Sequence, residues 1–205
     1  NLMSKFGALF LPKKKYNFPL KMISSEIPIG INYEAGVSAQ LKSSVILAGL
    51  NSYGYTKIIE KIKSRDHTEN FLIKNKKVIK INYRKKKIIR LLGKKKLNPV
   101  YINVPGDPSS AAFFTTLTLL NQNSTLRIKN VGLNSTRTGF YEILKKHNAK
   151  IKFTNLIKEN NEIRGDIIVR NSKIKPLKAS KKYYVNSTDE YPILFVIAGL
   201  TKGIS

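Results

Sequence analysis

Cysteine and tryptophan are absent from the chain, and only two histidines, His67 and His147, are present. Without cysteine there is no disulfide framework, no thiol nucleophile, and no cysteine-ligated zinc or iron–sulfur cluster. Two histidines so far apart argue against a histidine-based metal site. No apolar run approaches the ~18 residues that a membrane-spanning helix requires. We therefore predict a soluble chain with no metal site and no transmembrane segment.

Acidic residues are scarce: 12 Asp and Glu stand against 38 Lys and Arg, which gives a formal charge of +26. Such a charge suits a nucleic-acid-binding module, because clustered cations neutralise phosphates. However, the basic runs are short, separated and almost purely lysine: Lys13–Lys15, Lys85–Lys87 and Lys94–Lys96. Arginine-rich stripes with interleaved aromatics, which read or stack on bases, are missing. Heavy use of Lys, Ile and Asn is typical of an AT-rich genome, and small anionic substrates suit a basic surface equally well.

Several familiar signatures of catalysis are also missing. The sequence has no glycine-rich phosphate loop ending in Lys-Ser/Thr, no Gly-x-Gly-x-x-Gly after a strand and no nucleophile elbow. Its acidic residues show no spaced pair of the kind that glycosidases use. What the sequence does hold is 41% hydrophobic residues, which is enough to build a folded core.

An apolar helix followed by a polar turn and a β-rich strand occurs three times. The helices are expected at Gln40–Leu50, Ala111–Leu120 and Tyr191–Leu200, and their last leucines lie 70 and 80 residues apart. In the first two copies an amphipathic helix and two strands follow, with the strands expected at residues 78–83 and 88–92 in the first copy and at 150–153 and 163–170 in the second. Each unit is therefore roughly β-α-β-α-β-β. Hydroxyls of Ser64 and Ser135 are expected to cap the amphipathic helices. Because the first helix of each unit is apolar nearly all round, we expect sheets to enclose it.

Residues 98–108 contain several prolines and a glycine, which makes this stretch the best candidate for a boundary or hinge. We predict two lobes, residues 1–103 and 104–205, with the hinge near Val104–Asp107. The chain opens in what reads as the last turn of a helix closed by Gly7, and it stops where a helix should lead into a strand. We therefore interpret the sequence as a piece of a longer protein.

Three helix starts combine residues that can bind anions or move a proton. Ser38–Gln40 places a hydroxyl, an amide and free N–H groups where the helix dipole favours an anion. Arg65, next to Ser64, can make a forked contact to a phosphate or a carboxylate. Asp189 precedes the third apolar helix and is a candidate general base toward a hydroxyl. Each also has a purely structural alternative, a helix cap or a local ion pair.

Six segments occur in the order in which a known family has them: residues 38–43 (SAQLKS), 48–50 (AGL), 64–69 (SRDHTE), 104–114 (VPGDPSSAAFF), 130–139 (NVGLNSTRTG) and 189–192 (DEYP). Together they resemble the 5-enolpyruvylshikimate-3-phosphate synthase family. The resemblance covers nearly the whole chain and corresponds to the middle section of that enzyme. It implies an α/β fold with two lobes of repeated β-α-β-α-β-β units around buried helices, an inside-out α/β barrel. The fold would be incomplete in this chain, and the lobes would close on the substrate between them.

The resemblance implies a transferase of the shikimate pathway, which leads to the aromatic amino acids. The enolpyruvyl group of phosphoenolpyruvate would pass to the 5-hydroxyl of shikimate 3-phosphate, with release of phosphate. The implied partners are these two small molecules, without a cofactor, a nucleic acid or a membrane. The full-length enzyme would be a cytoplasmic monomer.

The resemblance also implies which residues bind shikimate 3-phosphate. Ser38, Ala39 and Gln40 would contact it, with Gln40 also near phosphoenolpyruvate. Ser64 and Arg65 would hold its phosphate. These roles are coherent physically, because arginine and helix-start N–H groups offset the repulsion between two anions.

Asp189 would accept the proton of the attacking 5-hydroxyl, again by the resemblance. The family's other Lys, Arg and Glu residues around phosphoenolpyruvate have no counterpart in this chain. We therefore expect the chain by itself to be inactive.

Other functions stay open at this point. The related enolpyruvyl transferase that acts on UDP-N-acetylglucosamine would place a reactive Cys or Asp in a loop that this chain lacks, and it would not carry the segment 64–68. A basic nucleic-acid-binding module would bind its ligand with a steep dependence on salt. A non-catalytic remnant kept for interaction is a third alternative.

Overall fold

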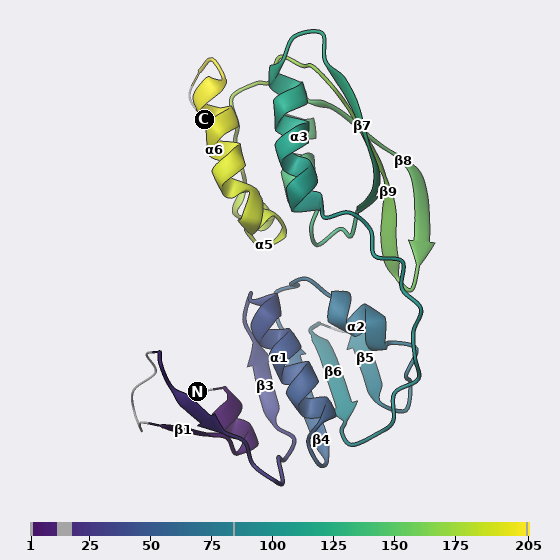
Figure 1. Cartoon of the computed structure of the whole chain (residues 1–205). Helices are drawn as coiled ribbons and strands as arrows, with labels where there is room; N and C mark the ends of the chain where they lie inside the picture. Colours follow the sequence, from purple (N-terminus) through teal and green to yellow (C-terminus); the bar gives the residue numbers. More distant parts are fainter. Residues whose placement is uncertain (1, 12–17, 84, 204) are drawn as a thin grey trace. The chain divides into compact units, whose positions relative to one another are not determined.

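The computed structural model describes residues 2–11, 18–83, 85–203 and 205 (Figure 1). The chain divides into two compact units, Asn1–Val100 and Tyr101–Ser205, and each is described here by itself. The finer division at residue 103 and the hinge near residues 104–107 stay predictions. The basic run Lys13–Lys15 lies outside the described residues.

Unit 1 is built on a four-stranded mixed sheet in the order β3-β4-β6-β5. Its strands are β3 (Asn32–Ala35), β4 (Tyr55–Glu60), β5 (Ile79–Tyr83) and β6 (Lys87–Leu92). β3 and β4 are parallel, whereas β6 is antiparallel to both of its neighbours. Helix α1 (Ala39–Leu50) connects β3 to β4, and α2 (His67–Leu72) follows β4. This order confirms the predicted β-α-β-α-β-β unit.

The chain before this sheet forms a short 3-10 helix, η1 (Met3–Phe6), and a hairpin of β1 (Leu9–Leu11) and β2 (Lys21–Ile23). Gly7 closes η1 with a φ of 95°, and its N–H donates to the Met3 and Ser4 carbonyls. Glycine adopts this left-handed conformation without steric cost. The predicted helix end at Gly7 is therefore confirmed.

The core of unit 1 lies between α1 and one face of the sheet. Five fully buried aliphatic side chains form its centre: Val45, Ile46, Ile58, Ile89 and Leu91. Burial of each contributes about 1.5–3 kcal/mol relative to exposure. Gly49 allows α1 to approach β4 closely, because a Cβ at this position would lie 2.8 Å from the Thr56 hydroxyl oxygen.

Unit 2 contains a three-stranded antiparallel sheet in the order β7-β9-β8. Its strands are β7 (Thr125–Gly132), β8 (Lys150–Glu159) and β9 (Glu162–Arg170). Helix α3 (Pro108–Leu120) precedes the sheet, and α4 (Gly139–Lys146) connects β7 to β8. The chain then passes through η2 (Lys181–Tyr183), α5 (Tyr184–Ser187) and η3 (Thr188–Glu190) into α6 (Tyr191–Leu200), which spans the residues predicted for it.

Within the described residues, unit 2 reduces the leading strand of the repeated unit to a single parallel bridge. Gly106 pairs with Val131 of β7. The Gly106 N–H donates to the Asn130 carbonyl at 2.7 Å, and the Gly132 N–H donates to the Gly106 carbonyl at 2.9 Å. Gly106 thus stands in the same relation to α3 and β7 as β3 does to α1 and β4.

The core of unit 2 places α4 against the start of α3. Phe140 and Tyr141 are fully buried, with their ring centroids 5.0 Å apart and edge to face, a favoured aromatic geometry. The Tyr141 hydroxyl donates to the Pro108 carbonyl at 2.7 Å. This bond satisfies the phenol inside an apolar core and fixes the first turn of α3.

β8 and β9 form a hairpin that is longer than the sequence predicted. Asn160 and Asn161 occupy its two-residue turn with φ of 50° and 63°, the left-handed values that such turns require. Asp166 on the central strand β9 supports an irregularity in each neighbour: it accepts from the Asn130 N–H at 2.9 Å and from the Asn155 side chain at 2.8 Å. The hairpin extends beyond the predicted 150–153 because these contacts carry the ladder past both irregularities.

Each apolar helix packs on its own unit with one side and exposes apolar side chains on the other. Leu47 of α1, Phe113 of α3 and Phe195 of α6 are 60%, 65% and 68% exposed. Both main sheets are open, so the predicted enclosure of these helices is not reached within the part of the chain that the structure describes. The exposed helix sides agree with an incomplete form of the predicted fold, because an open sheet covers only one side of a helix. No helix in the described ranges is long and apolar enough to cross a bilayer.

The two amphipathic helices begin later than predicted. α2 begins at His67 rather than at Ser64, and α4 begins at Gly139 rather than at Ser135. The predicted caps were therefore wrong. The Ser64 hydroxyl donates to the Glu60 carboxylate, a hydrogen bond that the charge of its acceptor strengthens.

Candidate functional site

The first turn of α1 carries the predicted residues Ser38, Ala39 and Gln40. Ser38 is the N-cap, and its Oγ accepts from the Leu41 N–H at 3.3 Å. The Ser38 hydroxyl also donates to Gln40 Oε1 at 3.3 Å, and Gln40 is exposed. This confirms the helix cap at Ser38. It leaves an accessible amide beside the N–H groups of the helix start, where the helix dipole favours an anion.

The turn between β4 and α2 carries Ser64 and Arg65. Ser64 is fully buried, and both its backbone N–H and its hydroxyl donate to Oε1 of Glu60, at 3.0 and 2.7 Å. Arg65 is half-buried. The turn is thus anchored by Ser64 from inside, while the next residue carries the guanidinium.

Four charged side chains meet next to this turn, and we call them the buried ion cluster: Lys42 of α1, Glu60 of β4, Glu69 of α2 and Lys87 of β6. Each is at most 9% exposed. Lys42 Nζ lies 2.7 Å from Glu60 Oε1 and 2.8 Å from Glu69 Oε1. Lys87 Nζ lies 2.9 Å from Glu69 Oε1 and 3.3 Å from Glu60 Oε2. The cluster is formally neutral and joins two helices and two strands.

Contacts within the buried ion cluster favour the charged forms of Glu60 and Lys87. Burial raises the pKa of Glu60, but the hydrogen bonds from Lys42 and Ser64 outweigh burial, so the pKa lies below its ordinary value. Burial lowers the pKa of Lys87, but the neighbouring carboxylates of Glu69 and Glu60 outweigh it, and the pKa lies above its ordinary value. Opposite charges therefore compensate for the loss of solvation on both sides.

Asp189 belongs to unit 2, where it lies in η3 just before α6, with 45% of its side chain exposed. Arg137 Nη2 lies 4.0 Å from Asp189 Oδ2, 2.9 Å from Asp107 Oδ1 and 2.5 Å from the Ser109 hydroxyl. The Ser109 hydroxyl also donates to the buried Glu190. Arg137 thus joins the start of α3 to the segment that carries Asp189.

The structure places the predicted residues in two groups. Ser38–Gln40 and Ser64–Arg65 lie in unit 1, where Lys42 and Glu60 link α1 to the turn. Asp189 lies in unit 2 with Arg137 as a neighbour. The sequence analysis assigned no role to the buried ion cluster or to Arg137. A lysine inside an otherwise apolar helix was the available signal for the cluster, since an unpaired buried charge is too costly to keep.

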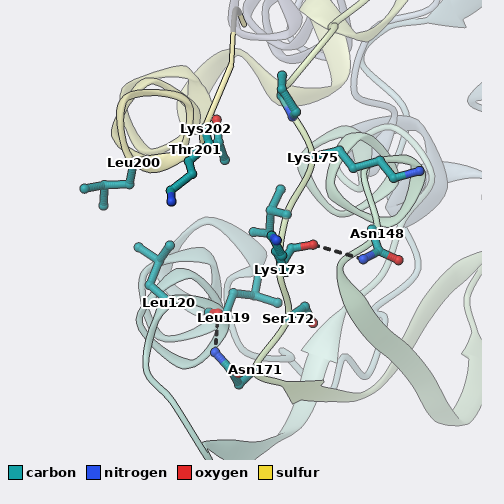
Figure 2. Close-up of a pocket in the computed structure, with 12 residues that line it drawn as sticks. Leu119, Leu120, Asn148, Asn171, Ser172, Lys173, Lys175, Leu200, Thr201 and Lys202 are labelled. Carbon is teal, nitrogen blue, oxygen red and sulfur yellow. Dashed lines mark hydrogen bonds between the residues drawn. The ribbon is translucent and has the colours of Figure 1, made fainter.

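A cavity with a volume of about 540 Å³ lies elsewhere in unit 2 (Figure 2). It lies at the carboxyl ends of α3 and α6, where Leu120 and Leu200 are the last helical residues, whereas Asp189 precedes α6. Figure 2 shows Asn148 donating to the Lys173 carbonyl in its wall. No predicted site residue lines this cavity. Within the described ranges, no three Asp, Glu, His or Cys side chains are grouped so that they could hold a metal ion.

Comparison with known proteins gives consistent matches along the chain. A family model described as EPSP synthase (3-phosphoshikimate 1-carboxyvinyltransferase) matches residues 7–205. The 3-phosphoshikimate 1-carboxyvinyltransferase of Novosphingobium aromaticivorans is 37% identical over 204 residues, and that of Petrotoga mobilis is 40% identical over 206 residues. Both alignments cover 98% of this chain and 46% of the relative. The chain therefore spans about half the length of the curated relatives it matches.

Solved structures agree with these matches. An EPSP synthase from Acinetobacter baumannii has a TM-score of 0.78 at 32% identity, covering 98% of this chain and 46% of that chain. The enolpyruvyl transferase NikO from Streptomyces tendae shares the fold, with a TM-score of 0.66 at 14% identity over 98% of this chain and 48% of that one. With a family model that spans nearly the whole chain and relatives well above 30% identity, this chain belongs to the EPSP synthase family.

Proposed function

We propose that the polypeptide containing this chain transfers the enolpyruvyl group of phosphoenolpyruvate to the 5-hydroxyl of shikimate 3-phosphate and releases phosphate. The observation that carries the proposal is the match to relatives named 3-phosphoshikimate 1-carboxyvinyltransferase over 98% of the chain. The geometry of unit 1 supports it, because an exposed amide and helix-start N–H groups lie at the start of α1. Lys42 of the same helix is linked through Glu60 to Ser64, the residue before Arg65.

In this proposal unit 1 supplies part of the binding site for shikimate 3-phosphate. Ser38, Ala39 and Gln40 contact the substrate from the first turn of α1, and Gln40 also faces phosphoenolpyruvate. Arg65 pairs with the phosphate of shikimate 3-phosphate, because a guanidinium matches phosphate oxygens in a forked geometry. Ser64 completes this part of the site by holding the turn, with its hydroxyl on Glu60.

Unit 2 supplies Asp189 as the general base in this proposal. The 5-hydroxyl must lose its proton as its oxygen bonds to phosphoenolpyruvate, and a carboxylate within hydrogen-bond reach accepts that proton. Asp189 is suited to the role because it is exposed, ionisable and held near Arg137. A positioned base typically contributes about 10²–10⁴-fold in rate.

The proposal includes the expectations that the enzyme is a cytoplasmic monomer, uses no cofactor and binds no nucleic acid. The structure describes only part of the proposed site, so the 205-residue chain alone is expected to be inactive. Gel filtration of the intact polypeptide measures its mass in solution and so tests whether it is a monomer. Retention of duplex DNA on a filter, falling steeply as salt is raised, would contradict the absence of a nucleic-acid partner.

The experiment that tests the activity measures phosphate release by the intact polypeptide with phosphoenolpyruvate and shikimate 3-phosphate. Release should require both compounds. UDP-N-acetylglucosamine as the acceptor should give no release, which separates the proposal from the related enolpyruvyl transferase. The proposed function is contradicted if phosphate is released when UDP-N-acetylglucosamine, but not shikimate 3-phosphate, is the acceptor of the enolpyruvyl group. It is also contradicted if neither acceptor supports release. The 205-residue chain serves as the matched comparison and should stay at background.

A further inference from the structure

The Glu60 carboxylate contacts residues from both parts of the candidate site in unit 1. Its Oε1 accepts from the Ser64 N–H at 3.0 Å, from the Ser64 hydroxyl at 2.7 Å and from Lys42 Nζ at 2.7 Å. Lys42 follows Gln40 by two residues on α1, and Ser64 precedes Arg65. One carboxylate oxygen therefore links the first turns of α1 to the turn that carries the arginine.

Three further contacts hold the same elements. Glu69 brings α2 to Lys42 at 2.8 Å and to Lys87 at 2.9 Å. The Ser43 and Thr68 hydroxyls join α1 to α2 at 2.8 Å. The position of the turn relative to α1 is thus determined from several directions by short, charge-assisted contacts.

Stability alone is a weak reason for four buried charges. Desolvation of an ion pair offsets most of its Coulomb attraction, and well-packed apolar residues often stabilise a fold as well or better. Unit 1 already has an apolar core between α1 and its sheet. Charged groups restrict geometry more than apolar ones do. A hydrogen-bonded carboxylate fixes the positions of its donors within tenths of an ångström, whereas apolar side chains can shift against one another while staying in contact.

We infer that the buried ion cluster is a positioning device for the phosphate of shikimate 3-phosphate. Glu60, held by Lys42 and Lys87, sets the Ser64 turn so that Arg65 and the start of α1 meet one anion together. Ser64 is a positioning residue in this arrangement, since its donors are engaged by Glu60 and its side chain is fully buried. The inference rests on the proposed function and adds Glu60, Lys42, Glu69 and Lys87 to its machinery.

The test uses two variants of the intact polypeptide that change the charge of the neutral cluster in opposite directions. Glu60→Gln leaves it at +1, and Lys87→Met leaves it at −1. If the cluster positions the turn, both variants raise KM for shikimate 3-phosphate by about five- to tenfold, the scale of one ordinary intramolecular hydrogen bond. KM for phosphoenolpyruvate should stay within about twofold in both.

Two results would overturn the inference. A long-range charge effect would tighten binding of the anion in Glu60→Gln and weaken it in Lys87→Met, so KM shifts of opposite sign reject positioning. A purely structural role would lower the melting temperature and leave both KM values unchanged. Asp166→Asn is the matched control for lost stability, because it removes a charged hydrogen-bonding centre in unit 2, and it should not move KM for shikimate 3-phosphate.

A double-mutant cycle tests whether Glu60 acts through Ser64. In a Ser64→Ala background, Glu60→Gln should add much less to KM than it does alone, because contacting residues are coupled. Full additivity contradicts this route. If Glu60→Gln does not fold, Lys87→Met is compared with Ser43→Ala, which loosens α1 from α2 without a change in charge. Both should then raise KM for shikimate 3-phosphate, and unchanged values in both reject positioning.

Calorimetric binding of shikimate 3-phosphate separates failure of this inference from failure of the proposed function. Wild-type protein that binds the compound and turns it over, with affinity unaltered in Glu60→Gln and Lys87→Met, overturns positioning and leaves the proposed function intact. Wild-type protein that shows neither binding nor phosphate release overturns the proposed function and, with it, the inference.

Discussion

Arg137 directs its guanidinium toward Asp189, with Nη2 4.0 Å from Oδ2, while the same nitrogen lies 2.9 Å from Asp107 Oδ1. Only 18% of the Arg137 side chain is exposed, so the contact is partly shielded from water and salt. The proposed base is therefore oriented by an arginine that is itself fixed to the first turn of another helix.

Replacing Arg137 with lysine should lower kcat about tenfold and leave KM for shikimate 3-phosphate near its wild-type value. Lysine keeps the charge but lacks the planar guanidinium, whose Nη2 contacts Asp107 and Ser109 and lies 4.0 Å from Asp189. Steady-state kinetics measure both constants. Arg164→Lys is the matched control, because Arg164 pairs with Glu159 at 3.7 Å in the same unit. A KM effect without a kcat effect would contradict the assigned role.

Replacing Asp189 with asparagine should reduce kcat by about 10²–10⁴-fold, the usual contribution of a positioned base. Affinity for shikimate 3-phosphate should change little, since the amide keeps the shape of the carboxylate but cannot take the proton. Calorimetry and phosphate release give the two readouts. Glu159→Gln removes another exposed carboxylate of unit 2 and should turn over normally. Unchanged turnover in Asp189→Asn removes Asp189 as the base.

Replacing Arg65 with alanine should weaken binding of shikimate 3-phosphate by about 1.5–3 kcal/mol, the scale of a hydrogen bond to a charged group. Lys63→Ala is a close control, because Lys63 carries the same charge on the same turn and pairs with Asp66 at 3.9 Å. Lys63→Ala should bind almost as the wild type does. Equal losses in the two variants would mean that charge, rather than a direct contact, governs affinity.

Asp166 should stabilise the protein only above the acid range. Hydrogen bonds from the Asn130 N–H, Arg127 and Asn155 lower its pKa to about 2. Because the folded-state pKa lies below the unfolded value, the stabilisation is present above about pH 4 and disappears as pH falls toward 2. Thermal melts of wild type and Asp166→Asn at pH 6 and pH 2 measure this. The difference in melting temperature should shrink at pH 2, and a constant difference would contradict the role of the charge.

The apolar helices were the most predictable part of the fold. α6 matches its predicted residues because a long apolar run begins at Tyr191-Pro192 and ends before Thr201. α3 starts three residues earlier than predicted, since Asp107 caps it through the Ser110 N–H and Pro108 suits its first turn. The starts of α2 and α4 were wrong because a serine is a frequent N-cap residue but does not by itself locate one, and Asp66 and Thr138 occupy the N-cap positions.

The candidate site was only partly predictable. Ser38 could be located because a cap and its helix are neighbours in the chain. The buried ion cluster could not, because Lys42, Glu60, Glu69 and Lys87 converge only after β4 and β6 pair and α2 folds back beside them. Lys42 inside an apolar helix signals that a partner is needed, but local patterns do not show which charges it meets.

The exposed apolar sides of α1, α3 and α6 have a consequence for handling the isolated 205-residue chain in solution. Its formal charge of +26 makes like molecules repel at low ionic strength, and this repulsion holds apart surfaces that would otherwise adhere. Added salt shortens the range of that repulsion to about 3 Å at 1 M and leaves apolar adhesion in place. The chain should therefore scatter light increasingly as sodium chloride is raised.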